Sequence, residues 1–141
     1  MALNIRLQRN EIKGNAGYGK YFGHVISNGE VRIEDFAKEI QDNCSMKKSD
    51  VKAVLEELQE TIKRHLQGGR TVVLPDIGRL KLSVETVGVD NPKLFNKAKH
   101  LKKVVCRFKP AGKHVGGKNG RLSYSLCEGT EVNVVRAPYA N

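Results

Sequence analysis

Apolar and polar side chains alternate at the start of the chain, which is the pattern of a half-buried β-strand. Leu3, Ile5 and Leu7 alternate with polar residues, and the aromatic and β-branched run 21–26 favours a second strand. The segment between them, 10–20, is polar and rich in glycine, so we expect a β-hairpin with a long turn. This segment contains G-x-x-x-x-G-K, the front half of a phosphate-binding loop, but Tyr21 stands where that loop needs Ser or Thr. We therefore interpret its glycines as turn residues.

After Asn28-Gly29 the apolar pattern changes to the period of an α-helix. Apolar residues at positions 33, 36, 37 and 40 predict a short amphipathic helix within 31–43, with Glu34 and Asp35 in its first turn. A second helix is predicted by a longer apolar stripe, which consists of Val51, Val54, Leu55, Leu58, Ile62 and Leu66. We expect Ser45 or Ser49 to cap this helix and Gly68-Gly69 to end it.

Strand patterns return after the second helix. The segments 71–74, 79–84 and 103–108 each fit a strand, and the last has one apolar face and one partly basic face. In the glycine-rich tail, 114–141, alternation at 122–126 and at 132–134 predicts a C-terminal β-hairpin. We expect this tail to pack against the N-terminal hairpin.

The positive charge of the chain is confined to one region. The net charge is +10, and no Asp or Glu occurs between Asn91 and Cys127, where ten Lys and Arg stand. The other fifteen Lys and Arg equal the fifteen Asp and Glu in number, so the rest of the chain is neutral. A segregated basic surface attracts polyanions, so DNA, RNA and an anionic membrane are the candidate partners. The alternative is a basic surface that is merely solvated, and we favour a nucleic-acid partner over it.

Catalytic and metal-binding patterns are weak. The basic region holds no paired carboxylates, and we find no Ser/His/Asp or Cys/His arrangement, so we expect neither an enzyme nor a small-molecule substrate. The three cysteines lack C-x-x-C spacing and the four histidines are scattered, so we expect no metal and no cofactor. Apolar neighbours lead us to expect buried, reduced thiols. No run is long and apolar enough to predict a membrane span.

The order of these elements resembles the HU/IHF family of bacterial histone-like DNA-binding proteins. The motifs that carry the resemblance are SMKKSDVKAVLEELQETIKRHLQGGRTVVLPDIGRLKL, from Ser45, and VCRFKPAGK, from Val105. The strands that precede the helices resemble the HU-like subfamily of Bacteroidetes, which carries added N- and C-terminal segments. The resemblance implies an α+β, IHF-like fold: two helices and an antiparallel sheet with a basic arm segment, here extended by the two terminal hairpins. It also implies an intertwined homodimer, and the long apolar stripe independently favours a two-fold partner.

We divide the chain into an N-terminal hairpin extension (1–30), an HU/IHF-like DNA-binding domain (31–113) and a tail packed on the same domain (114–141). Double-stranded DNA is the expected partner, bound through phosphates with little sequence specificity. The expected contact residues are Lys93, Lys97, Lys99, Lys102, Lys103, Arg107, Lys109, Lys113 and, more weakly, Arg79. As a nucleoid-associated protein, the chain is expected in the cytoplasm.

Asn91-Pro92 stands where the resemblance implies the proline of the arm tip, which wedges between base pairs in the family. The following apolar residues, Leu94, Phe95, Ala98 and Leu101, instead have helical spacing, with Asn91 as cap and Pro92 at the first position. We therefore predict a short basic helix within 91–103 rather than a flexible ribbon, and no strong DNA bending by Pro92.

Two other functions are compatible with the sequence. An HU-like dimer could act as a structural, protein-interaction module without significant DNA binding or bending. Single-stranded RNA binding is the other, although the basic region holds only Phe95, Phe108 and Tyr124 as stacking residues.

Overall fold

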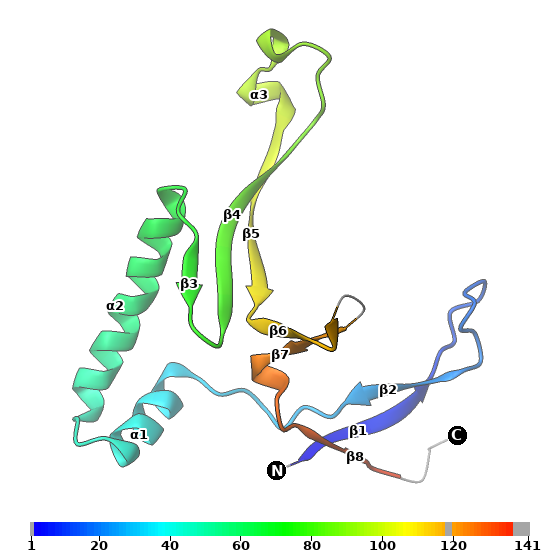
Figure 1. Cartoon of the computed structure of the whole chain (residues 1–141), viewed down its shortest axis with the longest axis vertical. Helices are drawn as coiled ribbons and strands as arrows, with labels where there is room; N and C mark the ends of the chain where they lie inside the picture. The colour runs from blue at the N-terminus through cyan, green and yellow to red at the C-terminus, as the bar shows by residue number, and fades with distance from the viewer. Residues whose placement is uncertain (1, 118–119, 137–141) are drawn as a thin grey trace. The chain divides into compact units, whose positions relative to one another are not determined.

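The computed structural model describes residues 2–117 and 120–136. Two compact units divide the chain: Met1–Glu30 together with Cys127–Asn141, and Val31–Leu126. The described residues form a mixed α+β structure, as predicted, with the helices in the second unit (Figure 1).

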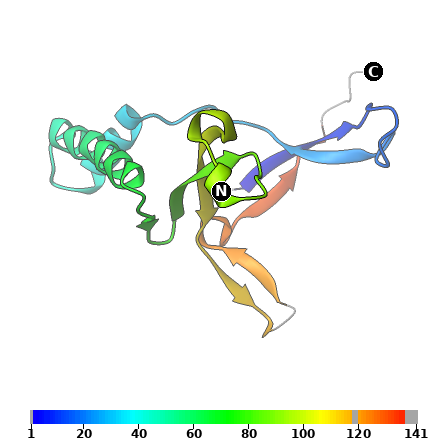
Figure 2. The same ribbon diagram turned by 90° about the horizontal axis from the view of Figure 1, so that it is seen from above.

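The first unit is a three-stranded sheet with the order β2-β1-β8. The strands β1 (Ala2–Arg9) and β2 (Tyr21–Val25) pair antiparallel, so the N-terminal hairpin is confirmed. On the other edge, β8 (Glu131–Val134) runs parallel to β1, with Leu3 opposite Val132 and Ile5 opposite Val134. Figure 2 shows these strands side by side.

The predicted C-terminal hairpin is wrong. The strand β7 (Arg121–Tyr124) pairs with β6 (Gly112–Val115) in a sheet of the second unit, whereas β8 pairs with β1. Between β7 and β8, the 3₁₀ turn η3 (Ser125–Cys127) and Gly129, with φ of 73°, form a longer connection than a tight hairpin turn. Alternation predicts which side chains share a face of a strand, but it does not identify the neighbouring strand.

The two predicted helices of the second unit are confirmed as α1 (Ile33–Asn43) and α2 (Lys48–Gln67). The Asp35 carboxylate accepts a hydrogen bond from the Arg32 N–H at 2.9 Å, and α2 ends at Gly68 as expected. The predicted serine cap is wrong, because Lys47 occupies the N-cap position without a side-chain hydrogen bond. The Gln41 side chain of α1 instead accepts the Lys48 N–H at 3.0 Å, so a neighbouring helix satisfies this donor.

The second unit also contains the antiparallel sheet β3-β4-β5. The short β3 (Val72–Leu74) pairs only with the start of β4 (Gly78–Thr86), and β4 pairs along its whole length with β5 (Leu101–Pro110). A side chain at Gly78 would collide with the Lys109 carbonyl oxygen, so the tight turn before β4 requires glycine. Beyond the end of β3, the β4–β5 pair continues as a two-stranded ribbon (Figure 1).

The segment that joins β4 to β5 is helical, but it is not the single helix that we predicted. It contains a 3₁₀ turn, η1 (Pro92–Leu94), and one turn of α-helix, α3 (Lys97–His100). Phe95 and Asn96 between them have extended backbones. The Asn96 side chain accepts the Ala98 N–H at 2.9 Å and so begins a new turn.

Apolar burial within one chain is small. Among the described residues, only Ala37, Val51 and Leu66 are buried hydrophobic residues. Members of the apolar stripe on α1 and α2 remain accessible, with exposed fractions of 49% for Phe36 and 59% for Val54. The expected burial of the cysteines is wrong for the single chain, because Cys44, Cys106 and Cys127 are all exposed. Their apolar neighbours lie on surfaces that one chain does not cover.

Candidate nucleic-acid interface

The β4–β5 ribbon has two chemically different faces. Alternation and register place Leu80 and Leu82 of β4 opposite Phe108 and Cys106 of β5 on one face. The other face carries Arg79 opposite Lys109 and Lys81 opposite Arg107. We call these four residues the cationic ladder. All four side chains are exposed, whereas Leu80 and Leu82 are partly buried.

The members of the cationic ladder have no acidic partners. In the part of the chain that the structure describes, no ion pair includes any of the four. Like charges directly opposite each other destabilise an antiparallel pair of strands. Two successive rungs of like charge are therefore unfavourable in the free protein, and a bound polyanion would remove this repulsion.

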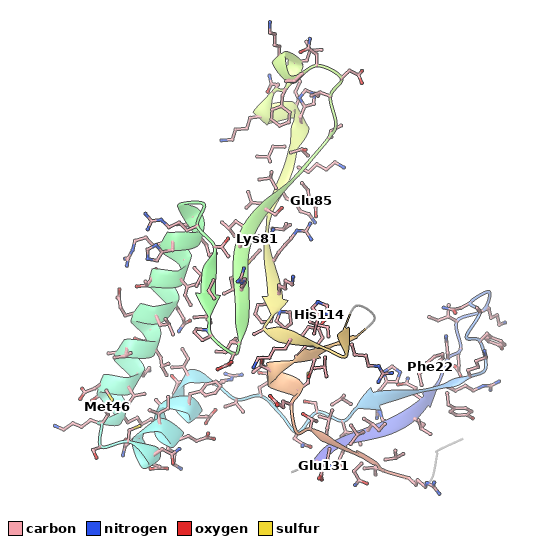
Figure 3. All side chains as sticks on the ribbon, viewed as in Figure 1. Phe22, Met46, Lys81, Glu85, His114 and Glu131 are labelled. Carbon is pink, nitrogen blue, oxygen red and sulfur yellow. The ribbon has the colours of Figure 1, made fainter. Side chains whose placement is uncertain are left out.

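One carboxylate lies farther along the same face. Glu85 stands opposite Lys103, and the two side chains form an ion pair of 3.5 Å. Figure 3 shows Lys81 and Glu85 on the same strand. The uncharged rung of Ser83 and Val105 separates the ladder from this ion pair. Beyond it the strands shift register, and Lys102 falls in this irregular step, between Lys103 opposite Glu85 and Leu101 opposite Thr86.

A second group of cations lies at the end of the ribbon. Lys93 belongs to η1, and Lys97 and Lys99 belong to α3. The Asn91 side chain accepts the Lys93 N–H at 3.0 Å, as predicted for a cap, and Pro92 occupies the first position of the turn. Pro92 is thus part of a capped turn, in agreement with the prediction of helical structure at this point.

The ribbon end also presents apolar side chains. Leu94 is 65% exposed, and Phe95 is 44% exposed although its ring contacts the ring of His100 at 5.5 Å between centroids. The Nδ1 atom of His100 accepts the Asn96 N–H at 2.8 Å, which fixes the unprotonated nitrogen of that ring. This part of the surface is therefore locally ordered and partly apolar.

The structure brings together some of the predicted contact residues and separates others. Arg79, Arg107 and Lys109 share one face of the ribbon, with Lys103 farther along it. Lys113 instead lies on β6, in the separate β6–β7 sheet. Lys81 is not among the predicted contact residues, although its alternation with Leu80 and Leu82 places it on the face of Arg79. Lys118 lies outside the described residues.

Other kinds of site have little support in the described segments. No group of three or more His, Cys, Asp or Glu residues there could hold a metal ion. None of the helices there combines the length and the apolar composition needed to cross a bilayer.

A two-helix body joined to an antiparallel sheet with a long basic ribbon defines an HU-like fold. The family model HU-HIG, described as "HU domain fused to wHTH, Ig, or Glycine-rich motif", matches residues 1–124. The chain therefore belongs to this family, and the resemblance noted in the sequence is confirmed.

Two solved structures are similar to the chain. One is the crystal structure of a candidate bacterial DNA-binding protein from Bacteroides vulgatus, with 12% identity, a TM-score of 0.64 and coverage of 99% of this chain. The chain spans 50% of the length of that protein. The other is a cocrystal structure of Anabaena HU with DNA, with 18% identity and a TM-score of 0.40, covering 56% of this chain and 85% of that one. The search of curated proteins finds no match.

Proposed function

We propose that the protein is a histone-like DNA-binding protein that holds duplex DNA through its phosphates, with little sequence specificity. Its domain of the HU type supports DNA as the ligand, and so does the description of the similar Bacteroides vulgatus protein as a candidate DNA-binding protein. The single observation that carries the proposal is the cationic ladder, where four exposed cations share one face and none has an acidic partner among the described residues.

The spacing of the ladder suits a phosphate backbone. Successive rungs on one face are two residues apart, which corresponds to about 6.8 Å along an antiparallel strand. Each phosphate of one DNA strand advances by about 3.4 Å along the duplex axis and also turns around it, so the direct distance between neighbouring phosphates is longer than this rise. Neighbouring rungs can therefore meet neighbouring phosphates of one strand. Arg79 and Arg107 can each present a planar guanidinium to two phosphate oxygens.

The ribbon end supports contact with the backbone rather than with base edges. The side-chain oxygens of Asn91 and Asn96 already accept backbone hydrogen bonds and so are engaged within the protein. Lys93, Lys97 and Lys99 then serve as point charges for phosphates. Duplex shape and deformability should decide preference among sequences.

We also propose that the protein acts as an intertwined homodimer with an IHF-like arrangement, in which residues 31–113 form the DNA-binding domain. The support is the apolar stripe on α1 and α2, since the exposed fractions of Val54 and Leu58 are 59% and 44% in the single chain. A two-fold partner would remove this surface from water. The proposed location is the nucleoid, in the cytoplasm, with no catalytic role.

Charge reversal tests the proposal. The variant Arg107→Glu/Lys109→Glu removes one cation from each rung, and its control, Lys38→Glu/Lys63→Glu, makes the same charge change on the helices. Each charged hydrogen bond contributes about 1.5–3 kcal/mol, so the ribbon variant should bind a 30-base-pair duplex on the order of 100-fold more weakly by fluorescence anisotropy. The control should bind like the wild type. Equal affinity of the two variants would contradict the proposal.

The structural-module alternative gives a different result in the same experiment. Its support is the apolar surface at Leu94 and Phe95, which a protein partner could cover. If it is correct, the wild-type dimer binds the duplex weakly and with little response to salt, and neither variant changes this. Binding that falls steeply with salt would instead eliminate the alternative.

A further inference from the structure

The turn between β1 and β2 has a defined conformation. The Asn10 N–H donates to the Lys20 carbonyl at 2.9 Å, and the Gly19 N–H donates to the Asn10 carbonyl at 2.8 Å, so the two bonds close the neck of the turn. Within the turn, the side chains of Asn10 and Asn15 accept the N–H groups of Ile12 and Gly17. The glycine-rich segment is thus a structured extension of the sheet of the first unit.

Gly17 allows the ring of Phe22 to lie against the turn. A Cβ atom at Gly17 would stand 2.9 Å from the Phe22 Cζ atom and 3.2 Å from its Cε2 atom, so a side chain at this position would displace the ring. The backbone thus supports the end of the ring. Phe22 nevertheless remains 46% exposed, so much of its ring is accessible at a fixed position on β2 (Figure 3).

The accessible ring forms part of a broad, open cleft of about 1020 Å³. Register places Gln8 opposite Phe22 and Arg6 opposite His24, so all four side chains share one face of the sheet. Polar, charged and apolar side chains surround the ring, and the lining includes Gln8, Arg9, Glu11, Ile12 and His24. The cleft therefore combines a planar apolar surface with hydrogen-bonding groups at its edge.

The lining of the cleft includes one cation, Arg9, and one carboxylate, Glu11. The hairpin that carries the cleft, residues 2–25, contains three further cations, Arg6, Lys13 and Lys20, and no further carboxylate. Within residues 2–117 and 120–136, none of the four cations takes part in an ion pair. Three of the eight Phe and Tyr residues also fall within 18–22. Exposed aromatic rings among cations are typical of surfaces that bind single-stranded nucleic acid, because bases stack on the rings while cations hold the phosphates.

We propose that this cleft is a second nucleic-acid site, which binds unpaired bases of a single strand by stacking on Phe22. A phosphate alone would need the cations but not the ring, and an acidic peptide would gain little from a flat aromatic surface. Unpaired bases use both features, and the amide and imidazole groups of Gln8 and His24 can bond to base edges. The site belongs to the first unit, whereas the cationic ladder belongs to the second, so separate variants can test the two.

The full-length protein tests the proposal with fluorescein-labelled oligothymidylate of 12 nucleotides and, in parallel, with the 30-base-pair duplex. Phe22→Leu keeps an apolar side chain against Gly17 but removes the stacking surface, so it should weaken oligothymidylate binding about 10-fold or more. It should leave the thermal midpoint and duplex affinity unchanged. Phe22→Trp should retain binding. Because the chain has no tryptophan, this variant also introduces a single fluorophore, whose emission oligothymidylate should quench saturably.

A second variant, Arg9→Glu, leaves the ring in place and should weaken oligothymidylate binding and make it less dependent on salt, because one phosphate contact is lost. The proposal would be overturned if a folded Phe22→Leu protein bound oligothymidylate like the wild type. It would also be overturned if oligothymidylate did not change the tryptophan emission of Phe22→Trp. The proposal would also fail if Arg107→Glu/Lys109→Glu abolished single-strand binding while Phe22→Leu did not, since the single strand would then bind to the ribbon. Absence of any oligothymidylate binding would also overturn the proposal.

Discussion

The helices and the ribbon carry the same kinds of charged residues, but they arrange them differently. Three cations of α2 have acidic neighbours: Lys52 lies 3.1 Å from Glu34 and 3.8 Å from Glu56, Lys63 pairs with Glu60, and Arg64 pairs with Glu57. Among the described residues of the ribbon, only Lys103 has such a partner, Glu85. The distribution of carboxylates, rather than the number of cations, therefore distinguishes a self-neutralised surface from one that can attract a polyanion.

The largest effect, dissociation of the proposed dimer, is expected from substitutions in the apolar stripe of the helices. Val54→Asp/Leu58→Asp should dissociate the proposed dimer, because each buried aliphatic side chain contributes about 1.5–3 kcal/mol and a buried carboxylate adds a further cost. Sedimentation equilibrium would measure the mass and circular dichroism the stability. Ile12→Asp is the control, since Ile12 is more accessible than either residue in the single chain, at 67%, but lies outside the helices. An unchanged dimer in the helix variant would rule out this interface.

A smaller effect, on duplex affinity, should follow from removal of the single carboxylate on the basic face of the ribbon. Glu85→Gln frees Lys103 and reduces repulsion of phosphates, so duplex affinity should rise about 2- to 5-fold, the range expected for one exposed ion pair. Glu56→Gln, which removes an acidic partner of Lys52 on α2, should leave duplex affinity unchanged. Equal responses to the two substitutions, measured by anisotropy at 100 mM salt, would remove the distinction between the two surfaces.

The smallest effect concerns the ion pair between α1 and α2. A hydrogen bond from its own backbone N–H, together with Lys52, lowers the pKa of Glu34 below its ordinary value of 4.5, and Glu34 raises the pKa of Lys52 above 10.5. The stabilisation by Glu34 is therefore fully present above pH 4.5 and is lost as the pH falls through the lowered pKa. Glu34→Gln should slightly lower the thermal midpoint at pH 7, and this difference should become smaller as the pH is lowered towards 3. A difference that does not become smaller would contradict this assignment.

Periodicity in the sequence predicted most of the local structure. The apolar stripe from Val51 to Leu66 predicted α2, and Gly68-Gly69 predicted where this helix ends. The alternation of polar residues with Leu80 placed Arg79 on the polar face of β4. Features that depend on a distant neighbour were not predictable. The α2 donor at Lys48 is satisfied by Gln41 of another helix, and β8 pairs with β1 across more than a hundred residues of sequence.

Only part of the candidate site was predicted, because some of its residues come together only through strand pairing. Composition identified the acid-free region, which includes Arg107 and Lys109. Lys81 lies outside that region, and only the register of β4 with β5 brings it opposite Arg107. The break between η1 and α3 was missed because Asn96 begins a new turn within an otherwise helical apolar pattern.

The central claim is that the cationic ladder binds duplex phosphates, and the salt dependence of duplex affinity tests it most directly. Each phosphate contact contributes about 0.9 to the slope of log K against log salt. Arg107→Ala/Lys109→Ala should therefore reduce the steepness of this slope by about 1.8 per protomer relative to the wild type. Lys38→Ala/Lys63→Ala should leave it unchanged. A wild-type slope in the ribbon variant would show that these cations do not contact phosphates.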